Sequence, residues 1–439
     1  MDNNSSISST SISILVLVVL VVLLLVLLVL VLLLIVQIVQ IAVLRVLSDI
    51  LLAVDRGDLA ALVLLDLSAA FDTVDHAILL QRLESSFGIA DVVLDWFRSY
   101  LSGRTQFVRC GGLRSSAVPL ICGVPQGSVL GPVLFILYVA DLAALIQKHD
   151  LSPHQYADDT QIYGSCSPSH VDEFSTKVSG CVNDVAGWMQ SNRLQLNPEK
   201  TEFLWCSTCR RQHQLPTATL TIGSTTVAPV PSVRDLGIFV DSDLVMRTHV
   251  CQTVSRCFAA LRQLRSIRHL VSATVFQSLV AALVLCRLDY GNGTLVGLPA
   301  YLINRLQSVQ NAAARLIFRL RRYDHITDAL VSLHWLRVPE RIVFKVAVQT
   351  YRALQGDMHM LRSIFGSSPP SPTRRPDKDS GLHPPIVCLF RLSDFLLLDV
   401  TPSLLLVLAF GTIYLRTLPP YLTYHCLHLT TYFAFPTLI

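Results

Sequence analysis

Residues Leu59–Asp72 read LAALVLLDLSAAFD, and this stretch decides the fold. Its apolar run, Leu59 to Leu67, has the length of one strand and predicts a strand buried in the core. Asp66 stands near the end of that run. A carboxylate there is costly unless it binds a cation or a hydrogen-bond partner. The alternative interpretation is a strand-end Asp that caps the following helix.

The flanking sequence alternates between helical and strand-like patterns. Leucine and valine recur at spacings of three and four over Ala42–Val54, which predicts a helix there. Further helices are expected over 78–87, 90–101, 129–146 and 171–193. Strands are expected over 106–109, 117–122, 201–206, 217–222 and 236–240, with a strand, turn and strand over 155–163. This mixture predicts an α+β fold.

The pattern becomes entirely helical from Met246 to Gly356. One apolar stripe in helical register marks this region: Leu302, Leu306, Val309, Ala313, Leu316 and Leu320. Asp241 to Arg352 holds fifteen basic and six acidic side chains, a formal charge of +9, whereas the whole chain carries only +4. A basic helical region beside an acidic site suits nucleic-acid binding, and a solvated basic face without a ligand is the alternative.

Two further segments have the composition of functional loops. Gly123–Ser128, GVPQGS, is a turn-rich loop that opens a helix and suits close approach to a phosphate or sugar. Tyr156–Thr160, YADDT, lies between two strand-like halves, where adjacent Asp residues can be simple turn formers.

Taken in order, LLDLSAAFDTVDH, GVPQGS and YADD resemble the palm of a reverse transcriptase of the non-LTR, LINE-type retrotransposon family. The resemblance extends through WFRSYLSGRTQFV, LNPEKTEFLW and VRDLGIFVD to RLQSVQNAAARLIF, and covers about Ala42 to Gly356. It implies a right-hand palm over 42–240, an antiparallel sheet with packed helices. An all-helical, thumb-like region follows over 241–356, and the fingers are largely missing.

The resemblance also implies a site and its ligands. Asp66, Asp158 and Asp159 would hold two Mg²⁺ ions, since hard cations prefer carboxylate oxygens. Phe71, Gln126 and Gly127 would contact the incoming dNTP, with Phe71 excluding a 2′-hydroxyl. Lys200 would lie near the pyrophosphate as a general acid, although a surface lysine is the alternative. RNA template and DNA primer are the implied partners, and Arg315, Arg319 and Arg322, expected on one helical face, would contact nucleic acid.

The first 41 residues form a low-complexity tract. Ile14–Val36 contains only Ile, Leu and Val, enough for a helix that crosses a bilayer. A translated simple repeat is the other interpretation. The family implies a nuclear or cytoplasmic protein, and insertion of residues 14–36 would add a membrane location. A membrane-anchored protein of unrelated role is therefore one alternative function.

Residues 357–385 are expected to be a proline-rich linker, and 386–439 an apolar tail of no assigned structure. Because the motifs are intact while their flanks depart from the family, we expect a truncated element copy. An inactive remnant that still binds nucleic acid is the second alternative function. Cys206, Cys209 and His213 do not predict a zinc site, because no fourth ligand follows at metal spacing.

Overall fold

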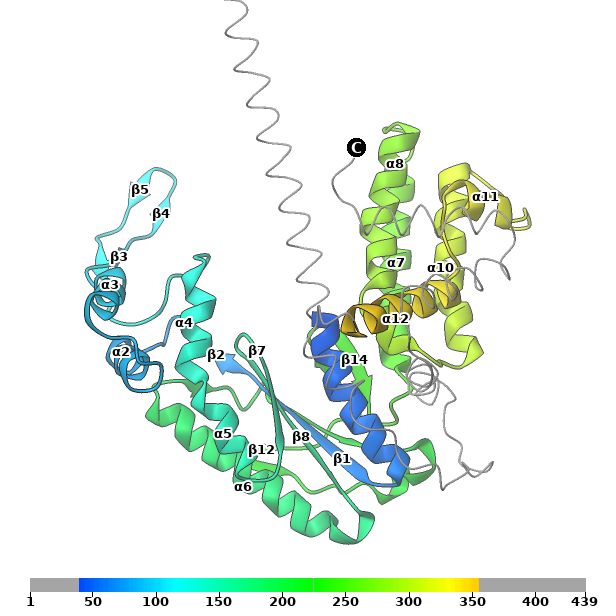
Figure 1. Cartoon of the computed structure of the whole chain (residues 1–439). Helices are drawn as coiled ribbons and strands as arrows, with labels where there is room; N and C mark the ends of the chain where they lie inside the picture. Colours follow the sequence, from blue (N-terminus) through cyan, green and yellow to red (C-terminus); the bar gives the residue numbers. More distant parts are fainter. Residues whose placement is uncertain (1–38, 224, 355–439) are drawn as a thin grey trace, which may run out of the picture.

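The computed structural model of this chain describes residues 39–223 and 225–354. At its centre lies a four-stranded antiparallel sheet. In spatial order its strands are β10 (Glu202–Cys206), β1 (Leu59–Leu65), β8 (Asp159–Cys166) and β7 (Ser152–Tyr156). The expected α+β class is confirmed, and the quoted stretch supplies an inner strand of the sheet (Figure 1).

Strand β1 is apolar throughout because helices cover both faces of the sheet. Ala60 and Leu62 point into a first core, which they share with the helix over residues 39–56 and the helices after residue 246. Ala61, Val63 and Leu65 point into a second core on the opposite face. Successive strand side chains alternate between faces, so one seven-residue strand stabilises both cores.

The second core is closed by helices from the first half of the chain. They are α2 (His76–Ser85), α3 (Asp91–Leu101), α4 (Leu130–Val139), α5 (Asp141–Gln147) and α6 (Val171–Ser191). The four expected helices are confirmed, with the third divided at Ala140 into α4 and α5. Leu130–Gln147 is apolar and long enough to cross a membrane by length and composition. Phe135, Tyr138 and Ile146 are buried in the second core, and 39% of the segment as a whole is buried inside the protein.

A β-arm projects between α3 and α4. It consists of two short ladders, β3 (Thr105–Gln106) with β6 (Val118–Pro119), and β4 (Arg109–Cys110) with β5 (Leu113–Arg114). The expected strands over 106–109 and 117–122 are therefore shorter than the sequence pattern indicates. The reason is that this segment covers no core and gains no burial from longer pairing.

Three further two-stranded pairs complete the sheet region. They are β2 (Leu67–Ser68) with β9 (Gln195–Leu196), β11 (Leu220–Ile222) with β12 (Thr225–Val227), and β13 (Ser232–Asp235) with β14 (Ile238–Asp241). Short 3₁₀ turns lie at Pro168–His170 and Cys209–Gln214. The strand expected over Leu59–Leu67 is thus divided in two at Asp66.

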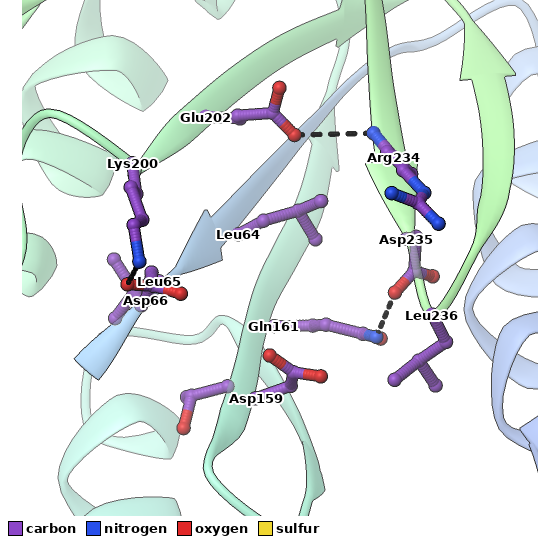
Figure 2. Close-up of a pocket in the computed structure, with 11 residues that line it drawn as sticks. Leu64, Leu65, Asp66, Asp159, Gln161, Lys200, Glu202, Arg234, Asp235 and Leu236 are labelled. Atoms are coloured by element: carbon purple, nitrogen blue, oxygen red, sulfur yellow. Dashed lines mark hydrogen bonds and ion pairs between the residues drawn. The ribbon is translucent and has the colours of Figure 1, made fainter. Parts of the chain in front are cut away.

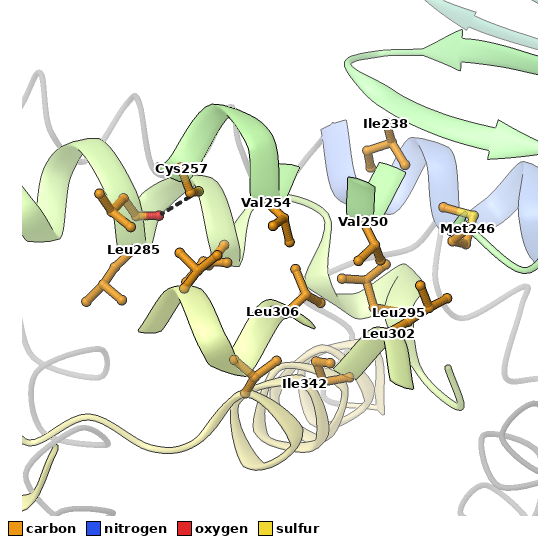
Figure 3. Packing of buried hydrophobic residues seen from close by; sticks show 14 of the residues in the cluster. Ile238, Met246, Val250, Val254, Cys257, Leu285, Leu295, Leu302, Leu306 and Ile342 are labelled. Carbon is orange, nitrogen blue, oxygen red and sulfur yellow. Dashed lines mark hydrogen bonds between the residues drawn. The ribbon is translucent and has the colours of Figure 1, made fainter. Parts of the chain in front are cut away.

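The first core is closed by a helical region. Its elements are α7 (Arg247–Ile267), α8 (Ala273–Val280), a π turn (Ala281–Leu285), α9 (Cys286–Asp289), a 3₁₀ turn (Asn292–Leu295), α10 (Ala300–Phe318), α11 (Thr327–Ser332) and α12 (Val338–Leu354). Figure 3 shows Val250, Val254 and Leu306 packing between these helices. The expected helical region is confirmed. The tracts expected at residues 14–36, 357–385 and 386–439 lie outside the described residues.

The basic face expected on α10 is not formed. The helix ends at Phe318, and Arg319 takes a left-handed conformation with φ 56°. Arg319 and Arg322 therefore lie beyond the helix, and they do not share a helical face with Arg315. Leu320 likewise falls outside the helix, although its amide still donates to the Arg315 carbonyl at 3.0 Å.

Candidate active site

Asp66 follows β1 directly, where the chain leaves the sheet to form β2. Its backbone carbonyl accepts a hydrogen bond from the Asn197 amide at 2.8 Å, which fixes the turn. Its side chain is different, because Oδ2 is buried without a hydrogen-bond partner. This oxygen instead forms an ion pair with Lys200 Nζ at 3.5 Å, which offsets part of the cost of burying the charge. The predicted strand-end position is confirmed, and the capping alternative is not, since Asp75 caps α2 instead.

The second and third carboxylates belong to the tight β7–β8 hairpin. Tyr156 pairs with Asp159, so Ala157 and Asp158 alone form the turn, with Ala157 at φ 54°. Asp159 is therefore the first residue of β8 rather than part of the turn. Since Thr160 pairs with Leu65 of β1, the preceding Asp159 emerges at the same end of the sheet as Asp66.

Electrostatics show that these three acids form one group. The pKa of Asp159 is raised, first by partial burial of its carboxyl and then by the negative charges of Asp158 and Asp66. Each acid thus makes ionisation of Asp159 less favourable. A cation placed among them would relieve this repulsion.

A pocket of about 100 Å³ opens beside this group (Figure 2). Six of the polar side chains that line it are Asp66, Asp159, Lys200, Glu202, Arg234 and Asp235. Lys200 Nζ lies 3.5 Å from Asp66 Oδ2, and its side chain is 68% exposed. An exposed ion pair of this kind contributes little stability, so Lys200 is free to turn toward another anion.

Asp235 is a residue of this pocket to which the sequence assigned no role. It ends β13, is 3% exposed, and accepts a hydrogen bond from the Gln161 side chain. Burial raises the pKa of Asp235 to about 7, and the charge of Asp159 adds to the effect. The β13–β14 hairpin is therefore attached to the strand that carries Asp159. One signal in the sequence could have revealed Asp235. It is an acidic residue in a strand, two positions after Val233, which is buried.

Phe71, Gln126 and Gly127 do not line this pocket. The Phe71 ring packs against Phe135 with centroids 4.8 Å apart, while its carbonyl accepts from the Val124 amide at 2.8 Å. The GVPQGS loop is thus held against the Phe71 turn. Gln126 and Gly127 are exposed at the tip of that loop. The predicted loop before a helix is confirmed, since α4 begins at Leu130.

Within residues 39–223 and 225–354, no three His, Cys, Asp or Glu side chains are gathered as closely as a formed metal cluster requires. The donor chemistry nevertheless fits a hard divalent cation. Asp66, Asp158 and Asp159 offer only carboxylate oxygens, and one of them, Asp66 Oδ2, accepts no hydrogen bond.

Comparison with known proteins agrees with this geometry. A family model described as reverse transcriptase (RNA-dependent DNA polymerase) matches residues 38–237. A probable RNA-directed DNA polymerase from transposon BS of Drosophila melanogaster is 29% identical over 309 residues, 68% of this chain and 33% of that protein. The RNA-directed DNA polymerase from mobile element jockey of the same species is 29% identical over 161 residues, 36% of this chain and 17% of that protein. Residues 38–237 are thus similar to the reverse transcriptase family, and the relatives that match them are polymerases of mobile elements.

The matched residues, 38–237, contain the sheet, the three carboxylates and the GVPQGS loop, which agrees with the expected palm fold. The chain spans about a third of the length of the transposon BS protein that it matches. A solved telomerase from Candida albicans covers 60% of this chain and 48% of its own, with a TM-score of 0.34 and 15% identity. That likeness is too distant to place individual residues.

Proposed function

We propose that this chain is an RNA-directed DNA polymerase that adds dNTPs to a primer 3′-hydroxyl on an RNA template. The observation that carries the proposal is the position of Asp66, Asp158 and Asp159 at one end of the sheet, where their charges interact and Asp66 Oδ2 accepts no hydrogen bond. Phosphoryl transfer depends mainly on positioning and charge stabilisation. Strand-end carboxylates supply the positioning, and the divalent cations that they would hold would supply the charge stabilisation.

Asp66, Asp158 and Asp159 would hold two Mg²⁺ ions. When bound, the ions lower the pKa of the attacking hydroxyl and stabilise the leaving pyrophosphate. The protein's own contribution is to keep the carboxylates in place. The β1–β8 pairing fixes Asp159, and the Asn197 amide fixes the turn after Asp66.

The remaining site residues would bind the incoming dNTP or transfer a proton. Lys200, whose exposed side chain already pairs with Asp66, would donate a proton to the leaving pyrophosphate. Gln126 and Gly127 would contact the incoming dNTP from the exposed loop tip. Phe71, half-buried against Phe135, would present its open edge to the sugar and exclude a 2′-hydroxyl.

The helical region over 247–354 would act as a thumb that grips the duplex of template and primer. Its support is electrostatic, because arginines are exposed along it at positions 256, 262, 265 and 305. Arg315, Arg319 and Arg322 remain candidates for phosphate contacts. They would act from the end of α10 and the turn after it, rather than from one helical face.

The direct test is primer extension by the full chain with Mg²⁺, dNTPs and an RNA template. We expect Asp158→Asn to abolish extension, because it removes one charge from the carboxylate group. Asp172→Asn, a matched change at the exposed first turn of α6, should leave extension unchanged. Synthesis by the Asp158→Asn variant at the unaltered rate would refute the assignment. RNA binding without any extension by the unaltered chain would favour a non-catalytic binding protein instead.

A further inference from the structure

The β-arm between α3 and α4, residues 104–120, has no place in the proposed chemistry. Every residue from 105 to 119 is exposed, and Figure 1 shows the arm projecting away from the sheet. Phe107, Val108 and Leu113 are 45%, 72% and 80% exposed. Apolar side chains clustered on such a projection mark an interaction surface.

The arm is nevertheless held in one conformation by its own backbone. The Leu120 amide donates to the Arg104 carbonyl at 2.8 Å and closes the base of the arm. Midway along it, the Ser115 amide donates to the Val108 carbonyl and the Val108 amide donates to Ser115 Oγ, both at 2.9 Å. Gly111 and Gly112, both at positive φ, form the two-residue turn at the tip. Only glycine adopts such a pair without strain, so the turn orders the hairpin locally.

The charge of the arm is entirely positive. Residues 96–140 contain four arginines and no Asp, Glu or Lys. Arg109 stands directly opposite Arg114 in the ladder, and like charges in that position are destabilising. No carboxylate within the described residues pairs with Arg104, Arg109 or Arg114. An anion bound between the two strands would remove the repulsion.

The aromatic side chain of the arm specifies the form of that anion. The Arg114 guanidinium lies 3.6 Å from the centroid of the Phe107 ring. A flat guanidinium stacked on an exposed aromatic ring is a surface on which an unpaired base stacks, while neighbouring arginines contact the phosphates. A duplex hides its bases and would use only the charges. The combination therefore favours a single strand.

The base of the arm lies next to the nucleotide side of the site. After β6 the chain runs into the GVPQGS loop, where Gly123 donates to Val74 and Val124 donates to Phe71, at 2.7 and 2.8 Å. The helical region stands on the opposite side of the sheet (Figure 1). A strand that reaches the site past the arm would thus arrive on the side away from the thumb-like helices.

We propose that the β-arm binds the single-stranded stretch of the RNA template before it enters the site. Arg109 and Arg114 contact its phosphates, and Phe107 stacks on a base. This inference rests on the proposed function for the identity of the strand. Its test measures binding alone, so it can fail while polymerisation stands, or succeed while polymerisation fails.

The test compares the full chain with an Arg109→Gln, Arg114→Gln double variant. Fluorescence anisotropy would follow binding of a labelled single-stranded RNA oligonucleotide, and of an RNA–DNA hybrid of equal length, over a range of salt concentrations. For the single strand, loss of two phosphate contacts should make the slope of log K against log salt shallower by about 1.4. Hybrid binding should be unchanged. Phe107→Ala should weaken single-strand binding at least about fivefold, and Phe107→Trp should restore it.

The matched control removes two exposed positive charges elsewhere. Arg56→Gln with Lys148→Gln alters the end of the first helix and the cap of α5, and should leave the salt slope unchanged. Circular dichroism of each variant verifies folding. An unaltered slope in the arm variant, an equal loss in the control, or an equal loss on the hybrid would each overturn the proposal. So would a change of oligomeric state with RNA binding intact, since the arm would then be a protein contact.

Discussion

Asp235 combines deep burial with a position in the pocket wall. Its carboxyl accepts from the fully buried Gln161 side chain, and burial, helped by the charge of Asp159, raises its pKa to about 7. The folded protein therefore keeps this proton at pH values where the unfolded chain, with a pKa near 3.8, has released it. This contribution to stability is fully present below the unfolded pKa and is lost as the pH rises through about 7.

The resulting prediction concerns the pH dependence of stability. Between about pH 4 and pH 7 the free energy of unfolding of the full chain should fall, by at most about 1.4 kcal/mol per pH unit from this group. Asp235→Asn should flatten that decline, because asparagine keeps an acceptor for Gln161 and carries no charge. Urea unfolding in EDTA measures it, since bound cations would alter the charge around Asp159.

Asp172→Asn is the matched control, because its carboxyl is exposed at the first turn of α6. It should retain the pH dependence of the unaltered chain. If Asp235→Asn shows the same decline as that control, Asp235 is ionised in the folded protein, and the raised pKa is wrong.

The three catalytic candidates could be found from the sequence because each lies in a short contiguous motif at a strand end or turn. Asp235 could not be found in this way. Its partner Gln161 is 74 residues away, and no local pattern marks the pairing. The alternative in which both adjacent aspartates are turn formers holds only for Asp158, because strand pairing sets Asp159 opposite Tyr156.

The start of helix α4 is shaped by a close approach at Gly131. A Cβ atom there would lie 2.6 Å from the Pro125 carbonyl oxygen, closer than real Cβ contacts allow. That carbonyl also accepts from Ser128 Oγ at 2.7 Å, and the Gly131 amide donates to the same hydroxyl at 2.9 Å. Helix and GVPQGS loop therefore form one unit that positions Gln126.

Gly131→Ala should push the loop off the helix. We expect a loss of about 1–3 kcal/mol of stability from overpacking, and a higher KM for dNTPs because Gln126 moves. Thermal unfolding and steady-state primer extension measure the two effects.

Gly187→Ala is the control, since an added Cβ in the middle of α6 meets nothing within 4 Å. It should instead stabilise by about 0.5–1 kcal/mol, as alanine replaces glycine in an open helix. Equal KM values for dNTPs in the Gly131→Ala and unaltered enzymes would show that the position of the loop does not affect dNTP binding.

Long elements were predictable where they carry a periodic apolar face, as α6 does with Val178, Val185 and Met189. The end of α10 was not, because no Gly or Pro marks it and the leucine pattern continues to Leu320. There the left-handed Arg319 stops the helix, and the Leu320 amide turns back to the Arg315 carbonyl. The β-arm was recognised only in outline, since exposed strands lack the alternation that burial imposes.

The two cores depend on one sheet, so we expect them to unfold together. Leu62 and Val63 are adjacent, fully buried, and belong to opposite cores. Each core also contacts at least one tryptophan. Trp205 lies in the second core against Phe203, with ring centroids 5.4 Å apart, and Trp335 packs against the first core. Unfolding of either face can therefore be observed separately.

We predict that the sheet and the helical region unfold in one transition, because neither core survives without β1. Leu62→Ala should cost about 2–5 kcal/mol and Val63→Ala about 1.5–3 kcal/mol. In chains that keep only Trp205 or only Trp335, urea unfolding should show coincident midpoints, shifted together by either substitution. A Leu62→Ala shift confined to the Trp335 signal would mean that the helical region unfolds on its own. The thumb-like helices would then be a separable domain, and the geometry of the strand-end carboxylates would not depend on them.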